Sequence, residues 1–114
     1  MTRPLLLALG LLAAPLAHAQ IDTATALLDS LRATASIADA GDRGAALDAL
    51  WSDLTTAGRV PFTAGDSAVF LWRGTAGAVG VAGDHTGWSP VAAERFGDVW
   101  ARAERFDPAA RVDY

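Results

Sequence analysis

The chain has 114 residues, no cysteine and no lysine, and a net charge of −4 that results from 13 acidic residues against nine arginines. The absence of cysteine excludes disulfides, thiolate metal sites, thiol catalysis and a lipoprotein anchor on an N-terminal cysteine. Nucleic acid and anionic membrane surfaces are disfavoured as partners, because phosphate binding relies on clustered Lys and Arg whereas these arginines are scattered among carboxylates. A P-loop is excluded because it requires a lysine.

Residues 1–19 are predicted to be a cleavable signal peptide. Arg3 gives a positive N-terminal region, residues 5–16 are an apolar stretch of signal-peptide length, and Ala-His-Ala at 17–19 fits a small-x-small cleavage site. A spanning helix is the alternative, but it needs about 20 apolar residues, and Gln20 already ends the run. We therefore expect a periplasmic or secreted protein with no membrane anchor after cleavage.

Residues 20–58 are predicted to form a helical segment with two amphipathic helices. Asp22 or Thr23 is expected to cap the first helix and Asp42 the second, each by accepting an unpaired backbone N–H. The second helix is expected to end before Gly58. The apolar positions at helical spacing are Leu27, Leu28, Leu31 and Ala35 in the first helix, and Leu47, Leu50, Trp51 and Leu54 in the second.

Residues 59–114 are predicted to be rich in β-strands. The segment Val-Phe-Leu-Trp at 69–72 is apolar at all four positions. Because successive side chains point to opposite faces, this predicts a strand covered on both faces. Further strands are expected around Val81, at 99–106 and at 111–114, which makes four in all. The fold class predicted from these patterns is therefore α+β.

Three sequence pieces in the stretch 70–90 (FLWRGTAGAVGVAGDHTGWSP) carry a family resemblance. A strand ending in Phe-Leu-Trp-Arg-Gly is followed by a Val-x-Val-x-Gly-Asp strand and then by a Gly-Trp-x-Pro loop. In this order they resemble the first half of an immunoglobulin-like early-set domain. Such domains are known as glycogen-binding-like modules and as the N-terminal domains of enterochelin-esterase-like hydrolases. The segment 46–62 is similar to the Trp-containing helix that precedes the domain in the esterase family, and it favours that family.

The resemblance implies that residues 59–114 form an incomplete antiparallel β-sandwich. A complete immunoglobulin-type sandwich needs about seven strands and ~100 residues. An unfinished sheet exposes unpaired backbone groups that invite pairing with other chains. We therefore expect either an N-terminal fragment of a longer protein or an edge that a partner covers.

No catalytic residue is predicted in the chain. Ser89 follows Gly87-Trp88 but lacks the second glycine of a G-x-S-x-G nucleophile elbow, and the proline after it removes an N–H donor, so a turn role is expected. His85 neighbours Asp84, yet no third member of a triad is evident, and a surface loop histidine is the expectation.

No metal site or cofactor is predicted either. Asp39, Asp42 and Asp48 are spaced superficially like calcium ligands, but they lack the rest of a twelve-residue loop. They are better explained as a helix-capping turn.

Trp88 is the one residue with a predicted binding role, as a carbohydrate-binding side chain. The resemblance to glycogen-binding modules implies that it stacks on a glucose ring. The competing and favoured expectation is that Trp88 packs its loop against the sandwich end, because burying a Trp hides ~150–250 Å², worth roughly 4–6 kcal/mol.

Three functions therefore compete. The favoured one is a non-catalytic N-terminal module of an exported α/β-hydrolase-fold esterase, whose partner would be a C-terminal hydrolase domain outside this chain. The second is an α-glucan-binding module that acts through Trp88. The third is a structural or partner-binding domain whose open sheet edge accepts a strand.

Overall fold

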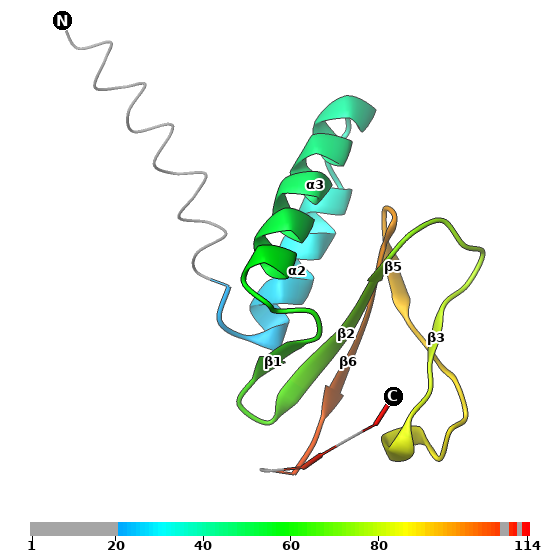
Figure 1. The fold of residues 1–114 in the computed structure, drawn as a ribbon. Coiled ribbons are helices and arrows are strands. Elements are labelled where there is room, and N and C mark those ends of the chain that lie inside the picture. The colour runs from blue at the N-terminus through cyan, green and yellow to red at the C-terminus, as the bar shows by residue number, and fades with distance from the viewer. Residues whose placement is uncertain (1–20, 108–109, 112) are drawn as a thin grey trace, which may run out of the picture.

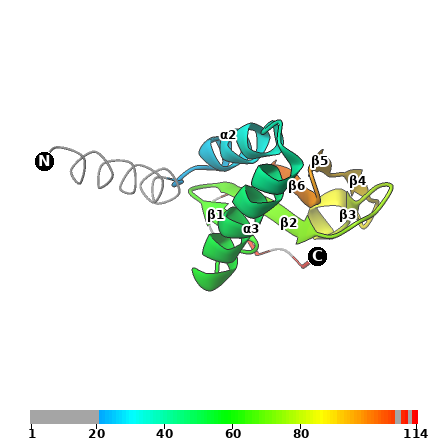
Figure 2. The same cartoon turned by 90° about the horizontal axis from the view of Figure 1, so that it is seen from above.

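The computed structural model describes residues 21–107, 110–111 and 113–114, so the predicted signal peptide lies outside the described residues. It shows an α+β fold in which two helices cover one face of a four-stranded antiparallel sheet, and a two-stranded sheet lies beyond the other face (Figures 1 and 2). The predicted α+β class with two helices is thus confirmed. The elements are α2 (Ala24–Ala35), α3 (Ala40–Thr56), β1 (Phe62–Ala64), β2 (Ser67–Arg73), β3 (Gly80–Val81), the short 3-10 helix η1 (Asp84–Thr86), β4 (Val91–Ala92), β5 (Glu94–Phe96) and β6 (Val99–Arg105).

Both helices begin at a side-chain cap. The Thr23 hydroxyl accepts the Ala26 N–H at 3.0 Å and caps the start of α2. Thr23 was one of the two residues predicted for this cap. The second predicted cap was wrong, because α3 is capped by Asp39, whose carboxylate accepts the Asp42 N–H at 2.8 Å. Asp42 instead lies in the first turn, where a negative charge is favourable beside the helix N-terminus.

The larger sheet has the strand order β1-β2-β6-β5, and all of its pairs are antiparallel. The two central strands, β2 and β6, are seven residues each and pair along their whole length, with Leu71 opposite Ala101 and Trp72 opposite Trp100. The smaller sheet pairs β3 with β4. Three of the strands were not predicted because β1, β4 and β5 are only two or three residues long, which is too short for a period of two to be visible.

The helices and the sheet share one hydrophobic core. Alternate residues of β2 and β6 point toward the helices, and the predicted leucine positions of both helices meet them. The fully or nearly fully buried members are Leu27, Leu31, Leu47, Leu50, Leu54, Phe62, Val69, Phe96, Val99 and Ala101. Because neither layer has a separate core, the helical segment and the strands are expected to fold as one unit.

The strand at 69–72 is covered on both faces over only part of its length. Val69 is completely buried against the helices, and Phe70 on the opposite face is 5% exposed under the rings of His85 and Tyr114. Trp72, two residues further on the same face as Phe70, is 46% exposed. The predicted strand at 99–106 corresponds to β6, whereas the described residues of 111–114 lie outside any strand, so that prediction was wrong.

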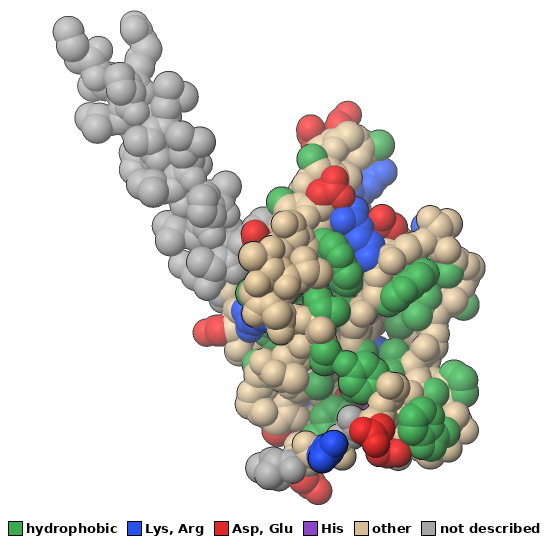
Figure 3. Space-filling view, in the orientation of Figure 1, with side chains coloured by type: hydrophobic (Ala, Val, Ile, Leu, Met, Phe, Trp, Pro, Cys, Tyr) green, Lys and Arg blue, Asp and Glu red, His purple; other side chains and the backbone are tan. Residues whose placement is uncertain are grey.

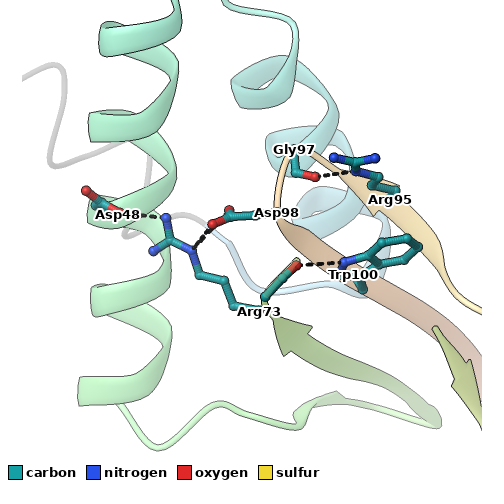
Figure 4. A network of polar contacts seen from close by, with 7 residues as sticks. Asp48, Arg73, Arg95, Gly97, Asp98 and Trp100 are labelled. Carbon is teal, nitrogen blue, oxygen red and sulfur yellow. Dashed lines mark hydrogen bonds and ion pairs between the residues drawn. The ribbon is translucent and has the colours of Figure 1, made fainter. Parts of the chain in front are cut away.

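An arginine between two carboxylates ties α3 to the end of β2 (Figure 4). Arg73 Nε donates to both carboxylate oxygens of Asp98 at 3.1 Å, and its Nη2 donates to Asp48 of α3 at 2.6 Å. The hydrogen bond to Asp48, and then the one to Asp98, raises the pKa of Arg73 above its ordinary value. At the same end of the sheet, the indole N–H of Trp100 donates to the Gly74 carbonyl at 3.1 Å.

Candidate functional site

The loop between β3 and β4 carries the predicted site residues, and its conformation is fixed by hydrogen bonds to one carbonyl. The Gly83 oxygen accepts from the Thr86 N–H and hydroxyl, both at 3.0 Å, and from the Trp88 N–H at 2.9 Å. Thr86 Oγ1 in turn accepts the Gly83 N–H at 3.0 Å. Gly87 takes a left-handed conformation, with φ 60°, which glycine adopts without a steric penalty. The loop is therefore a compact turn that presents the residue after Gly87.

Trp88 is presented outward. Its side chain is 58% exposed, and its indole N–H donates to Asp84 Oδ1 at 3.1 Å. Its own φ is 63°, in the left-handed region that bulky residues rarely occupy. It is the only non-glycine residue with positive φ in the described part of the chain. The hydrogen bond to Asp84 fixes the direction of the indole while leaving much of the ring in solvent.

The favoured expectation that Trp88 packs the loop against the sheet was wrong, because another side chain occupies that place. His85 stacks on Phe70 with ring centroids 5.3 Å apart and planes 14° from parallel, and it meets Phe106 edge-on at 5.3 Å. The expectation of a surface histidine was equally wrong. Both ring nitrogens of His85 are buried and have no hydrogen-bond partner among the described residues. With His85 turned inward, the indole of Trp88 turns outward.

The remaining polar residues of the loop do not assemble into a catalytic group. Ser89 is exposed in the turn that was predicted for it, and its N–H donates to the Thr86 carbonyl at 3.2 Å. The Asp84 carboxylate accepts from Trp88 and, through Oδ2, from the Asp113 N–H at 3.2 Å. No hydrogen bond within the described ranges joins Ser89, His85 and Asp84 side chains to one another, so the geometry offers no activated nucleophile here.

The aspartates with calcium-like spacing form hydrogen bonds with different parts of the fold. Asp39 caps α3 and Asp48 pairs with Arg73, as described above. Among residues 21–107 and the described C-terminal positions, no group of three or more His, Cys, Asp or Glu side chains could hold a metal ion.

A groove with a volume of about 530 Å³ lies between the two sheets. Its floor is the outer face of the large sheet, with Phe70, Trp72 and Trp100, and residues 78–82 form one side. Tyr114 lies against Phe70 with ring centroids 4.5 Å apart and also lines the groove. Figure 3 shows hydrophobic side chains reaching the surface on the side of the molecule where β3 lies.

Sequence reasoning missed two parts of this region. The first is Asp84, which was considered only as a neighbour of His85. The spacing of four residues between Asp84 and Trp88 in a glycine-bounded turn was the available signal for their hydrogen bond. The second is the pairing of Trp72 with Trp100 across two strands, which depends on a register that the sequence does not reveal.

Comparison with protein-family models, with curated proteins and with solved structures found no match for the chain. Within the part of the chain that the structure describes, no helix has the length and apolar character needed to cross a membrane.

Proposed function

We propose that the chain is a non-catalytic, exported binding module that offers Trp88 as a stacking platform for a sugar ring, with an α-glucan as the ligand class. The observation that carries the proposal is an exposed indole on a left-handed backbone. Holding a bulky side chain at positive φ costs about 1–2 kcal/mol. An indole that remains 58% exposed recovers little of this by burial. Because stability gives no reason for a tryptophan here, a contact with a ligand is the better explanation.

The geometry around the indole suits stacking. Asp84 engages the indole N–H at the ring edge, which sets the ring direction without covering its faces. The flat apolar face of a pyranose ring can lie against such a surface, and the neighbouring carboxylate can accept sugar hydroxyls. The resemblance to glycogen-binding-like domains supports an α-glucan as the sugar. The two facing sheets also support the immunoglobulin-like, early-set interpretation of residues 59–114.

Retention on immobilised glycogen tests this function directly. We expect Trp88→Ala to abolish retention while the melting temperature stays nearly unchanged, as is usual for surface substitutions. Trp88→Phe should retain part of the binding because it keeps an aromatic face. The matched control is Trp72→Ala, since Trp72 is similarly exposed but lies outside the loop. Retention that is equal in Trp88→Ala and the unmodified chain would rule the proposal out.

A second candidate, a module of an exported enterochelin-esterase-like enzyme, is favoured by the packing of α3. The resemblance places a Trp-containing helix before the early-set domain, and here α3 shares its core with the sheet and is bridged to it by Arg73 and Asp48. If the gene continues past codon 114, it should encode G-x-S-x-G followed by Asp or Glu and then His. A stop codon with no hydrolase domain in a neighbouring frame would remove this candidate. If the predicted export signal is cleaved, N-terminal sequencing of the exported protein should give Gln20 as the first residue.

A further inference from the structure

Residues 113 and 114 lie against the loop that presents Trp88, beside η1 (Figure 1). Two hydrogen bonds join the main chain of Asp113 to Asp84. The Asp84 N–H donates to the Asp113 carbonyl at 3.1 Å, and the Asp113 N–H donates to Asp84 Oδ2 at 3.2 Å. The other oxygen of the same carboxylate, Oδ1, accepts the indole N–H of Trp88 at 3.1 Å. One carboxylate therefore connects residue 113 to the indole.

The ring of Phe70 supports both the loop and residue 114. Tyr114 meets this ring at an interplanar angle of 62°, with ring centroids 4.5 Å apart, and His85 stacks on it at 5.3 Å. The inward position of His85 is what leaves Trp88 on the outside. Residues 113 and 114 thus contact both groups that set the direction of the indole, namely the Asp84 carboxylate and the ring on which His85 rests.

Gly83 has a backbone conformation that does not require glycine, and the position of residue 113 explains why no side chain is present there. Its φ of −172° and ψ of −173° are those of extended backbone. A Cβ at Gly83 would lie 2.5 Å from the Asp113 carbonyl oxygen, which is too short for a non-bonded contact, and 3.1 Å from two atoms of the His85 ring. The close approach of residue 113 to the loop therefore depends on the missing side chain.

We infer that residues 113 and 114 position the Trp88 indole for its ligand, by holding the Asp84 carboxylate that accepts the indole N–H. The inference rests on the proposed function of Trp88 as a sugar-stacking platform. A ring whose direction is fixed before binding loses less conformational freedom when the ligand arrives, and this preorganisation raises affinity. Because Asp113 and Tyr114 act through Asp84, they are positioning residues and not ligand contacts.

Two substitutions release residues 113 and 114 from opposite sides. Gly83→Ala places a methyl group against the Asp113 carbonyl, and Gly77→Ala is its matched control because a Cβ at Gly77 would meet no atom within 4 Å. Tyr114→Ala removes the ring contact with Phe70. Tyr114→Phe is the control for this variant, since phenylalanine keeps the ring.

Two measurements on each variant separate positioning from general stability. Calorimetric titration with maltoheptaose, a soluble α-glucan, gives the affinity. The heteronuclear nuclear Overhauser effect of the Trp88 indole N–H, recorded without ligand, reports how rigidly the ring is held. We expect Gly83→Ala and Tyr114→Ala each to lower this effect and to weaken maltoheptaose binding about three- to tenfold, while both controls behave like the unmodified chain.

The other outcomes contradict the inference. An unchanged nuclear Overhauser effect in the two alanine variants overturns it, and so does a lowered effect with unchanged affinity. A change confined to one alanine variant also overturns it, because the cause would then be a local contact, such as that of the His85 ring with residue 83. If the unmodified chain does not bind maltoheptaose, the proposed function fails, and the nuclear Overhauser comparison decides separately whether residues 113 and 114 hold the indole.

Discussion

Arg73 at the end of β2 and Asp48 in the middle of α3 are joined by a 2.6 Å hydrogen bond, although 25 residues separate them in the sequence. Asp98 holds the same guanidinium from its other side, so Arg73 is fixed before it reaches the helix. An arginine whose guanidinium already forms hydrogen bonds loses less side-chain entropy when it forms another ion pair. This contact is therefore a better candidate for real stabilisation than an ordinary surface ion pair.

A double-mutant cycle should measure that contact. We expect Arg73→Met and Asp48→Ala to show a coupling of about 0.5–1 kcal/mol in the free energy of unfolding, a modest value because the Asp48 side chain is 70% exposed. The exposed pair of Arg105 and Asp66, in which the arginine is joined to one carboxylate, is the control and should couple less strongly. Urea unfolding curves provide the numbers. Equal coupling in both pairs would show that Asp98 does not preorganise the arginine.

Two glycines should respond in opposite directions to alanine. Gly97 has φ 64°, and a Cβ there would lie 2.6 Å from Leu47 Cδ1, so Gly97→Ala should lower the free energy of unfolding by about 1–3 kcal/mol. Gly44 lies inside α3 with open space around it, so Gly44→Ala should raise it by roughly 0.5–1 kcal/mol. Thermal melts of both variants make the comparison. A stabilising Gly97→Ala would mean that this turn relaxes more easily than its geometry indicates.

Because Trp88 has a positive φ, the effect of a substitution there on the free energy of unfolding should depend on whether the new side chain is branched at Cβ. Trp88→Gly removes the strain of positive φ but adds chain entropy to the unfolded state, so its free energy of unfolding should stay within about 1 kcal/mol of the unmodified chain. Trp88→Val places a β-branched residue at φ 63° and should cost about 1–2 kcal/mol. Denaturant unfolding separates the two. A valine variant as stable as the glycine variant would indicate that the loop changes its backbone conformation.

The hydrogen bond between Asp66 and Arg105 should make a small contribution to the free energy of unfolding, and this contribution should be lost in acid. Arg105 Nη2 donates to Asp66 Oδ2 at 2.7 Å, and this hydrogen bond lowers the pKa of Asp66. The contribution is therefore present above the ordinary carboxyl value of about 3.9 and is lost as pH falls through the lowered pKa. The stability difference between the unmodified chain and Asp66→Asn should shrink between about pH 4 and pH 2, as followed by melting at low ionic strength. A difference that stays constant over this interval would contradict the assignment.

The sequence predicted those parts of the fold in which one periodic pattern extends over many residues. The leucines of both helices and the strand at β6 are of this kind, since burial of a continuous face demands the pattern. The Asp39 cap was missed because two aspartates three residues apart offer the same chemistry, and only the backbone distinguishes them. The direction of Trp88 could not be predicted, because it depends on His85 taking the inner position on Phe70, a contact between segments 15 residues apart.

The hydrogen bonds between residue 113 and residue 84 have a practical consequence for handling the protein. Asp113 accepts the Asp84 N–H through its carbonyl and donates to the Asp84 carboxylate, and that carboxylate also orients Trp88 (Figure 1 shows the C-terminus beside this loop). An affinity tag or surface linkage added after Tyr114 would therefore pull on the hydrogen bonds that aim the indole. Attachment ahead of Ile21, which is buried beside α2, leaves the loop untouched. Sensor chips and resins that immobilise the protein through its C-terminal end should accordingly underreport whatever Trp88 binds.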